Sequence, residues 1–170
     1  MRTATTPHST GQPKRALLLA CGNTLRGDDG VGWCIGCAAE QFRRADLTVV
    51  MTRQLLPEHA EAISAADLVI FVDCSAVTAA GTISTIPIQP AESIPRTFTH
   101  HLDPGSLLRL AQDLYDRTPA HALAITVGGE SFELTDRLSR TVKAAVPKAL
   151  EAVRCALCGS PMSETMAQVC

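Results

Sequence analysis

Short apolar runs alternate with amphipathic segments along most of this chain, and this alternation constrains the fold more than any other feature. The runs are too short for helices. The most apolar runs also lack the alternation of polar and apolar residues found in a strand with one solvent-exposed face, so they predict strands buried on both faces. The predicted strands are 15–21, 47–53, 67–75, 81–88 and 121–129, and the predicted helices are 30–42, 57–64, 103–116 and 134–156. Because helices between strands require crossover connections, we expect a three-layer α/β/α sandwich with a mostly parallel sheet of roughly five strands.

Local signals refine these elements. Segment 81–88 alternates and contains a proline, which predicts a strand at the edge of the sheet. The sequence Asp-Pro at 103–104 is typical of a helix start, and either Thr135 or Asp136 is the expected cap of the last helix.

The length of the chain allows one domain. Its 170 residues are 46% hydrophobic and 19% charged, a composition typical of a folded globular protein. Residues 1–14 are rich in Thr, Ser, Pro and Gly, and we expect them to form a disordered extension. Residues 15–154 would be a single α/β domain, monomeric, followed by a flexible cysteine-containing tail over 155–170.

Composition argues against nucleic acid and membrane as partners. The formal charge is −2 without a long basic block, and aromatic residues make up only 4%. No segment approaches the roughly 20 apolar residues that span a bilayer. The apolar run 16–20 is also shorter than the about 7–15 residues of a signal sequence, so we expect a cytoplasmic protein.

The seven cysteines include two Cys-x-x-Cys pairs, Cys34/Cys37 and Cys155/Cys158. Without an export signal they are expected to be reduced thiols. A zinc site made from both pairs is conceivable, but the first pair lies in an apolar helical pattern, which favours buried thiols. The roles of Cys155, Cys158 and Cys170 stay open.

Groups able to bind a metal follow several predicted strands. The motif GNTLRGDDGVG, with Asp28 and Asp29, follows the first strand, and Asp73 ends the third. His100 and His101 precede a helix, and Glu130 follows the last strand. Ligands of open α/β sheets bind at the carboxyl ends of the strands, where two carboxylates and an imidazole would suit Ni²⁺, Zn²⁺ or Fe²⁺. These aspartates could instead be helix or turn caps, and the histidines could be surface residues.

Other catalytic motifs are missing from the sequence. The glycine-rich segment 22–32 has neither the Gly-Lys-[Ser/Thr] of a phosphate loop nor a G-x-G-x-x-G pattern. The sequence contains no G-x-S-x-G elbow. Cys74 is a poor nucleophile on this evidence, because the neighbouring Asp73 would raise its pKa.

The motif GNTLRGDDGVG resembles the Gly-Asn, acidic-pair, glycine motif of the [NiFe]-hydrogenase maturation endopeptidases. The resemblance extends over residues 16–154 and includes ADLVIFVDCSAVTAAGTI, TFTHHLDPGSLLRLA and ITVGGESFELTDRLSRTVKAAVPKALEAV. It implies an α/β/α sandwich that removes the C-terminal extension of a hydrogenase large-subunit precursor once nickel has been inserted. The nickel, supplied by the precursor, would be the recognition element.

The resemblance also implies site residues. The family's metal-binding and catalytic positions correspond to Asp29, Asp73 and His100, with His101 as the alternative to His100. His100 is preferred because Leu102, Leu107 and Leu108 then match the apolar positions of the family's next helix. Supporting roles fall to Gly22, Asn23, Asp28 and Gly30. Glycines allow close backbone approach, Asn23 would fix the turn, and Asp28 would cap the helix or orient Asp29.

Three hypotheses follow from the sequence. The first is the processing endopeptidase. The second is a metal-binding accessory protein of hydrogenase assembly that binds the precursor without cleaving it. The third is another α/β hydrolase, or a nucleotide-binding module, that uses the same edge of the sheet.

Overall fold

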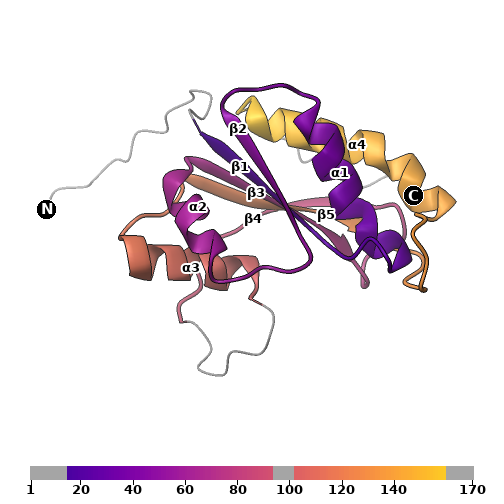
Figure 1. The fold of residues 1–170 in the computed structure, drawn as a ribbon, viewed down its shortest axis with the longest axis horizontal. Coiled ribbons are helices and arrows are strands. Elements are labelled where there is room, and N and C mark those ends of the chain that lie inside the picture. The colour runs from indigo at the N-terminus through magenta and orange to yellow at the C-terminus, as the bar shows by residue number, and fades with distance from the viewer. Residues whose placement is uncertain (1–14, 94–101, 160–170) are drawn as a thin grey trace, which may run out of the picture.

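The computed structural model describes residues 15–93 and 102–159, and it confirms the predicted α/β/α sandwich with a mostly parallel five-stranded sheet (Figure 1). The strands are β1 (Ala16–Cys21), β2 (Leu47–Thr52), β3 (Leu68–Ser75), β4 (Ile83–Pro87) and β5 (His121–Gly128). The helices are the 3₁₀ helix η1 (Gly27–Gly30), α1 (Val31–Glu40), α2 (His59–Ala65), α3 (Pro104–Tyr115) and α4 (Arg140–Leu157).

Helices α1 and α4 cover one face of the sheet, and α2 and α3 cover the other (Figure 1). Strand β1 is buried along its whole length, and its residues alternate between two cores. Leu18 belongs to the core beneath α1 and α4, whereas Leu17 and Leu19 belong to the core beneath α2 and α3. This period of two is the geometry of a strand with helices on both faces, and it explains the unbroken apolar run in the sequence.

The strand order is β2-β1-β3-β5-β4. Strands β1, β2, β3 and β5 are parallel, and β4 pairs with β5 in the antiparallel sense. The proline-containing strand is therefore at the edge, as predicted. From β1 the chain passes through α1 to β2, which lies on one side of β1. From β2 it passes through α2 to β3, which lies on the other side of β1. The carboxyl ends of β1 and β3 thus flank the switch point, where sheets of this type bind ligands.

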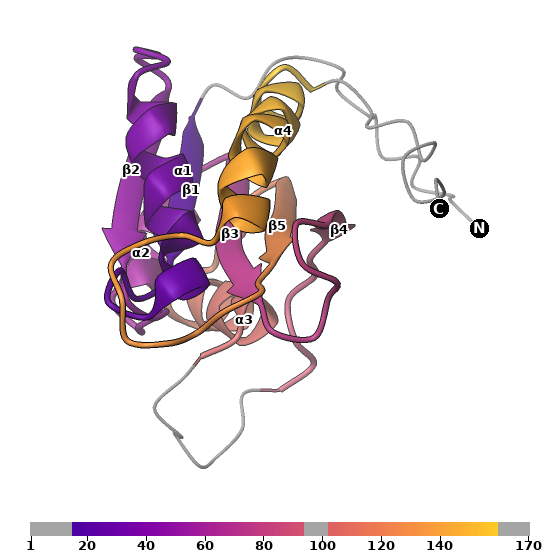
Figure 2. The same ribbon diagram turned by 90° about the vertical axis from the view of Figure 1, so that its right-hand side faces the viewer.

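The loops at this switch point come from distant parts of the chain. Figure 2 shows the loop between β5 and α4 passing beside η1, near the end of β3. An isolated parallel bridge joins Arg26 to Thr135, and η1 contacts β3. Residues at 26–30, 73 and 129–139 therefore belong to one end of the molecule.

Some sequence predictions were wrong in detail. Helix α4 starts after Ser139, which caps it by accepting a hydrogen bond from Val142 N, so neither Thr135 nor Asp136 is the cap. The helix continues to Leu157, one residue beyond its predicted end at 156, so Cys155 lies in the last turn of the helix and not in the tail assigned to 155–170. Helix α1 ends at Glu40 instead of residue 42. The predicted extension 1–14 and the tail residues 160–170 lie outside the described residues.

The thiols also differ from expectation. Cys34 and Cys37 were predicted to be buried, but both are exposed on α1. In residues 15–93 and 102–159, no group of three or more His, Cys, Asp or Glu side chains could hold a metal ion. A zinc site made from Cys34, Cys37, Cys155 and Cys158 is therefore not formed.

The same described residues contain no helix with the length and apolar character needed to cross a membrane.

Candidate active site

The loop after β1 folds back on itself. Gly22 has a φ of +136°, a conformation that side-chain-bearing residues rarely adopt, and a Cβ there would overlap the carbonyl oxygen of Asp29. Asn23 Oδ1 accepts a hydrogen bond from Leu25 N at 3.0 Å, and Asn23 N donates to Asp29 Oδ2 at 2.9 Å. The Gly-Asn pair thereby brings the carboxylate of Asp29 back to the end of β1.

Asp28 has a different environment from its neighbour. Its side chain is fully buried, and Oδ2 accepts hydrogen bonds from Glu130 N at 2.8 Å and Ser131 N at 2.9 Å. Oδ1 accepts from Ser139 N at 2.6 Å. Neither η1 nor α1 has a side-chain cap, so Asp28 does not cap the following helix, one of the two roles expected for it. It holds the β5–α4 loop against η1.

These bonds determine the ionisation of Asp28. Burial alone would raise its pKa, but the N–H groups of Ser131, Ser139 and Glu130 lower the pKa below its usual value. Asp28 is thus a buried carboxylate stabilised by three backbone donors. Both oxygens of Asp28 are buried and accept hydrogen bonds that hold two loops together. Asp29 is therefore the member of the pair that can serve the candidate site.

Asp73 lies at the end of β3, where the residue stays accessible to solvent. Its Oδ1 accepts a hydrogen bond from Cys74 N at 2.8 Å, which lowers the pKa. The pKa of Asp73 is nevertheless raised overall, chiefly because the surrounding protein shields the carboxylate from part of the solvent, and further because of the negative charge of Asp29. The 3₁₀ helix η1, which carries Asp29, contacts β3, which carries Asp73, so the fold places these two predicted residues at the same end of the sheet. The effect of the Asp29 charge on the pKa of Asp73 agrees with this placement.

The donor set of this pair fits a divalent cation. Within the described residues, Oδ1 of Asp29 and Oδ2 of Asp73 accept no hydrogen bond from the protein. Two carboxylates that repel each other, each with one free oxygen, would both be stabilised by a cation between them. His100 and His101, the predicted third ligands, lie outside the described residues. The predicted ligand set therefore stays a prediction.

Nearby thiols are unsuited to nucleophilic catalysis. Burial, together with the charges of Asp29, Asp73 and Asp28, raises the pKa of Cys74 to about 12. Burial and Asp73 raise the pKa of Cys21 to about 12 as well. Both residues are therefore protonated at neutral pH, and the thiolate is the reactive form of cysteine. The hydroxyl of Ser75 is hydrogen bonded to the hydroxyl of Thr78 at 2.7 Å, an arrangement that supplies no general base.

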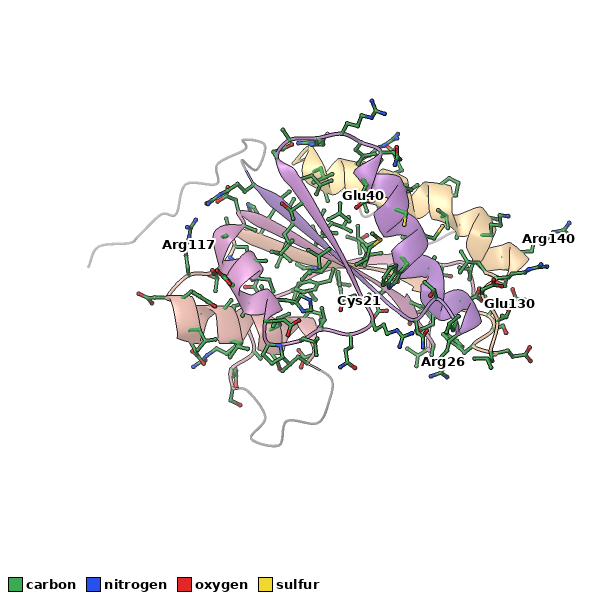
Figure 3. The ribbon with its side chains drawn as sticks, viewed as in Figure 1. Cys21, Arg26, Glu40, Arg117, Glu130 and Arg140 are labelled. Atoms are coloured by element: carbon green, nitrogen blue, oxygen red, sulfur yellow. The ribbon has the colours of Figure 1, made fainter. Side chains whose placement is uncertain are left out.

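Sequence reasoning missed the apolar side chains at this end of the molecule. Leu25 is 50% exposed and Leu134 is 88% exposed. Their loops are paired, because Thr135 N donates to the carbonyl oxygen of Leu25 and the carbonyl oxygen of Thr135 accepts from Gly27 N. Val77, in the loop after β3, is 97% exposed. Figure 3 shows Arg26 and Glu130 at the same end. Exposed aliphatic residues in several loops at a site often mark a binding surface, but their exposure depends on the fold and has no sequence signal.

The fold and the site together define an α/β protein that presents paired carboxylates, rather than a phosphate loop, at the switch point of its sheet. No family model matches the sequence, and no curated protein matches it significantly. Solved structures do match. The hydrogenase maturating endopeptidase HybD from E. coli has a TM-score of 0.68 and 27% identity, covering 84% of this chain and 91% of that chain.

Two further structures agree with this match. An endopeptidase from Escherichia coli, determined in solution, has a TM-score of 0.62 and 26% identity, over 84% of this chain and 91% of that one. The [NiFe] hydrogenase maturation protease HycI from Thermococcus kodakarensis has a TM-score of 0.66 over 85% of this chain and 93% of that chain, but its 19% identity supports the fold alone. This chain therefore resembles the hydrogenase maturation endopeptidases in fold, and it resembles HybD in sequence as well.

Proposed function

We propose that this protein is an endopeptidase that removes the C-terminal extension of a [NiFe]-hydrogenase large-subunit precursor after nickel insertion. The observation that carries the proposal is the placement of Asp29 in η1 and Asp73 in β3, two elements in contact at the β1/β3 switch point, in a fold similar to that of the hydrogenase maturating endopeptidase HybD. Nickel is part of the substrate in this proposal, held by the precursor when it arrives.

Recognition of the nickel would depend on the free oxygens of Asp29 and Asp73, together with His100 or, as the alternative, His101. Carboxylate and imidazole groups can complete the coordination of a divalent first-row metal that already has other ligands. Such recognition would make cleavage conditional on nickel, because a precursor without nickel contains no metal ion for these residues to coordinate. The N–H of Asn23, which donates to Asp29 at 2.9 Å, would keep the carboxylate in place.

The reaction needs no nucleophile from this protein. The nickel would act as a Lewis acid that polarises the scissile carbonyl. The protonated thiols of Cys74 and Cys21 would leave the attack to water. Asp29 and Asp73 would position the metal and keep negative charge near it, and the bonds of Asp28 would keep the β5–α4 loop from moving away.

The precursor also requires a surface for its polypeptide. Leu25 and Leu134 offer exposed aliphatic side chains on two paired loops beside η1. We assign these residues to contact with the precursor near its scissile bond. The protein would act as a monomer in the cytoplasm, where its thiols stay reduced, and its partner would be a protein rather than nucleic acid or membrane.

The test is incubation with purified precursor, with and without nickel, followed by mass spectrometry of the product. The wild-type chain should shorten only the nickel-loaded precursor, at its C-terminus. Asp29→Asn and Asp73→Asn should abolish shortening, while Asp136→Asn, an exposed aspartate of the β5–α4 loop, should leave it intact. Binding of the loaded precursor without shortening would instead support the accessory-protein hypothesis. Nucleotide binding that Asp73→Ala does not affect would support the third hypothesis.

A further inference from the structure

Three sulfur atoms come together on the face of the molecule formed by α1 and the edge strand β2. Cys34 and Cys37 are three residues apart in α1, so they share one side of the helix, and both are exposed. The Sγ of Cys37 lies 3.5 Å from the Sδ of Met51 in β2. Two thiols and a thioether therefore occupy one surface patch.

The placement of Met51 follows from the packing of α1. A Cβ on Gly36 would lie 3.0 Å from Met51 Cγ, 3.3 Å from Met51 Sδ and 2.9 Å from the Cβ of Ala20. Because Gly36 has no side chain, α1 packs closely on the sheet and the thioether lies directly against the helix. Trp33 fixes the next residue of β2, since its Nε1 donates to the carbonyl oxygen of Thr52 at 3.2 Å.

We propose that Cys34, Cys37 and Met51 form a binding site for one monovalent copper ion. Thiolate and thioether groups are the soft ligands that Cu(I) prefers, whereas the oxygen ligands of the Asp29–Asp73 site suit harder cations. Two sulfurs that each bind one ion at about 2.3 Å lie roughly 3.5–4 Å apart, which matches the separation of the Cys37 and Met51 sulfurs.

Charge is balanced when the ion binds. Cu⁺ would displace one proton from each thiol, so that two protons are released and the resulting Cu(I)-dithiolate carries one negative charge. Burial and the neighbouring Cys37 raise the pKa of Cys34, but Lys143 of α4 is close enough to lower it in part. The same ammonium group would offset the negative charge of the copper complex.

The second cysteine pair does not contribute to this site. Cys158 interacts with Arg44, which follows the C-terminal end of α1, whereas Cys34 lies in the first half of α1, near Lys143. Cys155 and Cys158 are therefore at the opposite end of the α1–α4 pair. They supply a matched control, because they have the same i,i+3 spacing at the end of a neighbouring helix, and within residues 15–93 and 102–159 neither sulfur contacts a methionine thioether.

The experiment is an anaerobic titration of the full chain with Cu(I), in competition with the chromophoric ligand bicinchoninate. A Cys155→Ser/Cys158→Ser variant is the reference, so that only the proposed site is counted. It should bind one Cu(I) per chain, and adding Cys34→Ser and Cys37→Ser should remove this binding. An outer-shell partner of a metal site is already worth about 10–100-fold in affinity, so Met51→Leu should weaken binding by at least about tenfold.

Two results would overturn the proposal. Copper binding that persists after Cys34→Ser and Cys37→Ser would assign the ion to other residues. An unchanged affinity in Met51→Leu would remove the thioether from the site. The single tryptophan, Trp33, lies next to Cys34 and reports by fluorescence that each variant is folded before titration.

Discussion

The carboxylate of Asp28 accepts a 2.6 Å hydrogen bond from the backbone N–H of Ser139, a residue 111 positions later in the chain. Ser139 is also the cap of α4, so one contact joins the turn before α1 to the start of the last helix. The adjacent aspartates thus have separate tasks. Asp28 holds the loops of the site together. Asp29 accepts a hydrogen bond from Asn23 N, and its 3₁₀ helix η1 contacts β3, the strand that carries Asp73.

Replacing Asp28 by Asn should destabilise the protein without removing a ligand. The amide has one oxygen, so its NH₂ group would face at least one of the three backbone N–H donors. A buried donor left unpaired costs about 1–3 kcal/mol in the free energy of unfolding. For a protein of this size, the thermal midpoint should fall by about 2–4 °C for each kcal/mol. Urea unfolding followed by Trp33 fluorescence measures the change.

The matched control is Asp136→Asn in the same loop. Asp136 is exposed, and its substitution should change the free energy of unfolding by less than about 0.5 kcal/mol. If the two variants were equally stable, the bonds of Asp28 would contribute no net stability.

Replacing Asp73 by Asn should have the opposite effect on stability. The pKa of Asp73 is raised in the folded protein, so its ionised form is less favourable there than in the unfolded chain, where the value is about 3.9. This cost is present at pH 7 and disappears as the pH falls through the folded pKa toward the unfolded one. In metal-free buffer, Asp73→Asn should therefore be more stable than wild type at pH 7, and the difference should vanish in acid.

A series of urea titrations between neutral and acidic pH, in the presence of a chelator, measures this difference. If Asp73→Asn had a lower free energy of unfolding than wild type at pH 7, the ionised Asp73 would stabilise the folded protein, and the prediction would be wrong.

The two histidines should differ in their effect on precursor cleavage. We predict that His100→Gln lowers the rate of nickel-dependent cleavage by about 100-fold or more, as expected for a lost ligand, and that His101→Gln changes it little. Single-turnover cleavage of nickel-loaded precursor measures both variants. The reverse order of effects would assign the ligand to His101, and two unaffected variants would exclude this loop from the metal site.

Charged substitutions of the exposed leucines should weaken the binding of the precursor. Leu25→Asp or Leu134→Asp should raise KM about tenfold, equivalent to about 1.4 kcal/mol, with kcat nearly unchanged. Leu114→Asp on α3 is the control, because Leu114 is 62% exposed but belongs to a helix away from the switch point. If all three variants had the same KM, the precursor would contact another surface.

Much of the fold could be predicted because its signals are local. The continuous apolar runs identified β1 and β3, and the Asp-Pro sequence identified the start of α3, where Asp103 accepts a hydrogen bond from Ser106 N at 2.9 Å. The position of Asp29 and Asp73 at one edge also followed from simple topology, because parallel strands end at the same side of a sheet.

The start of α4 and the role of Asp28 could not be predicted in this way. Thr135 looks like a helix cap in the sequence, but its backbone is paired with Arg26 and Leu25, which keeps it out of the helix. The exposure of Cys34 was missed for a similar reason. Its spacing fits the apolar side of α1, and only the packing angle of the helix on the sheet decides which residues are covered.

The order of strands in the sheet has a consequence for synthesis of the chain on the ribosome. Strand β4 is made before β5, its partner in the sheet. Likewise, the residues that donate hydrogen bonds to the Asp28 carboxylate, Glu130, Ser131 and Ser139, are made long after Asp28. The first half of the chain therefore contains β1, β2 and β3 but lacks groups that complete the site. Contacts of such long sequence separation form late. If the proposed function holds, a nascent or truncated chain that ends before β5 should be unable to process a precursor, and only finished molecules would be active.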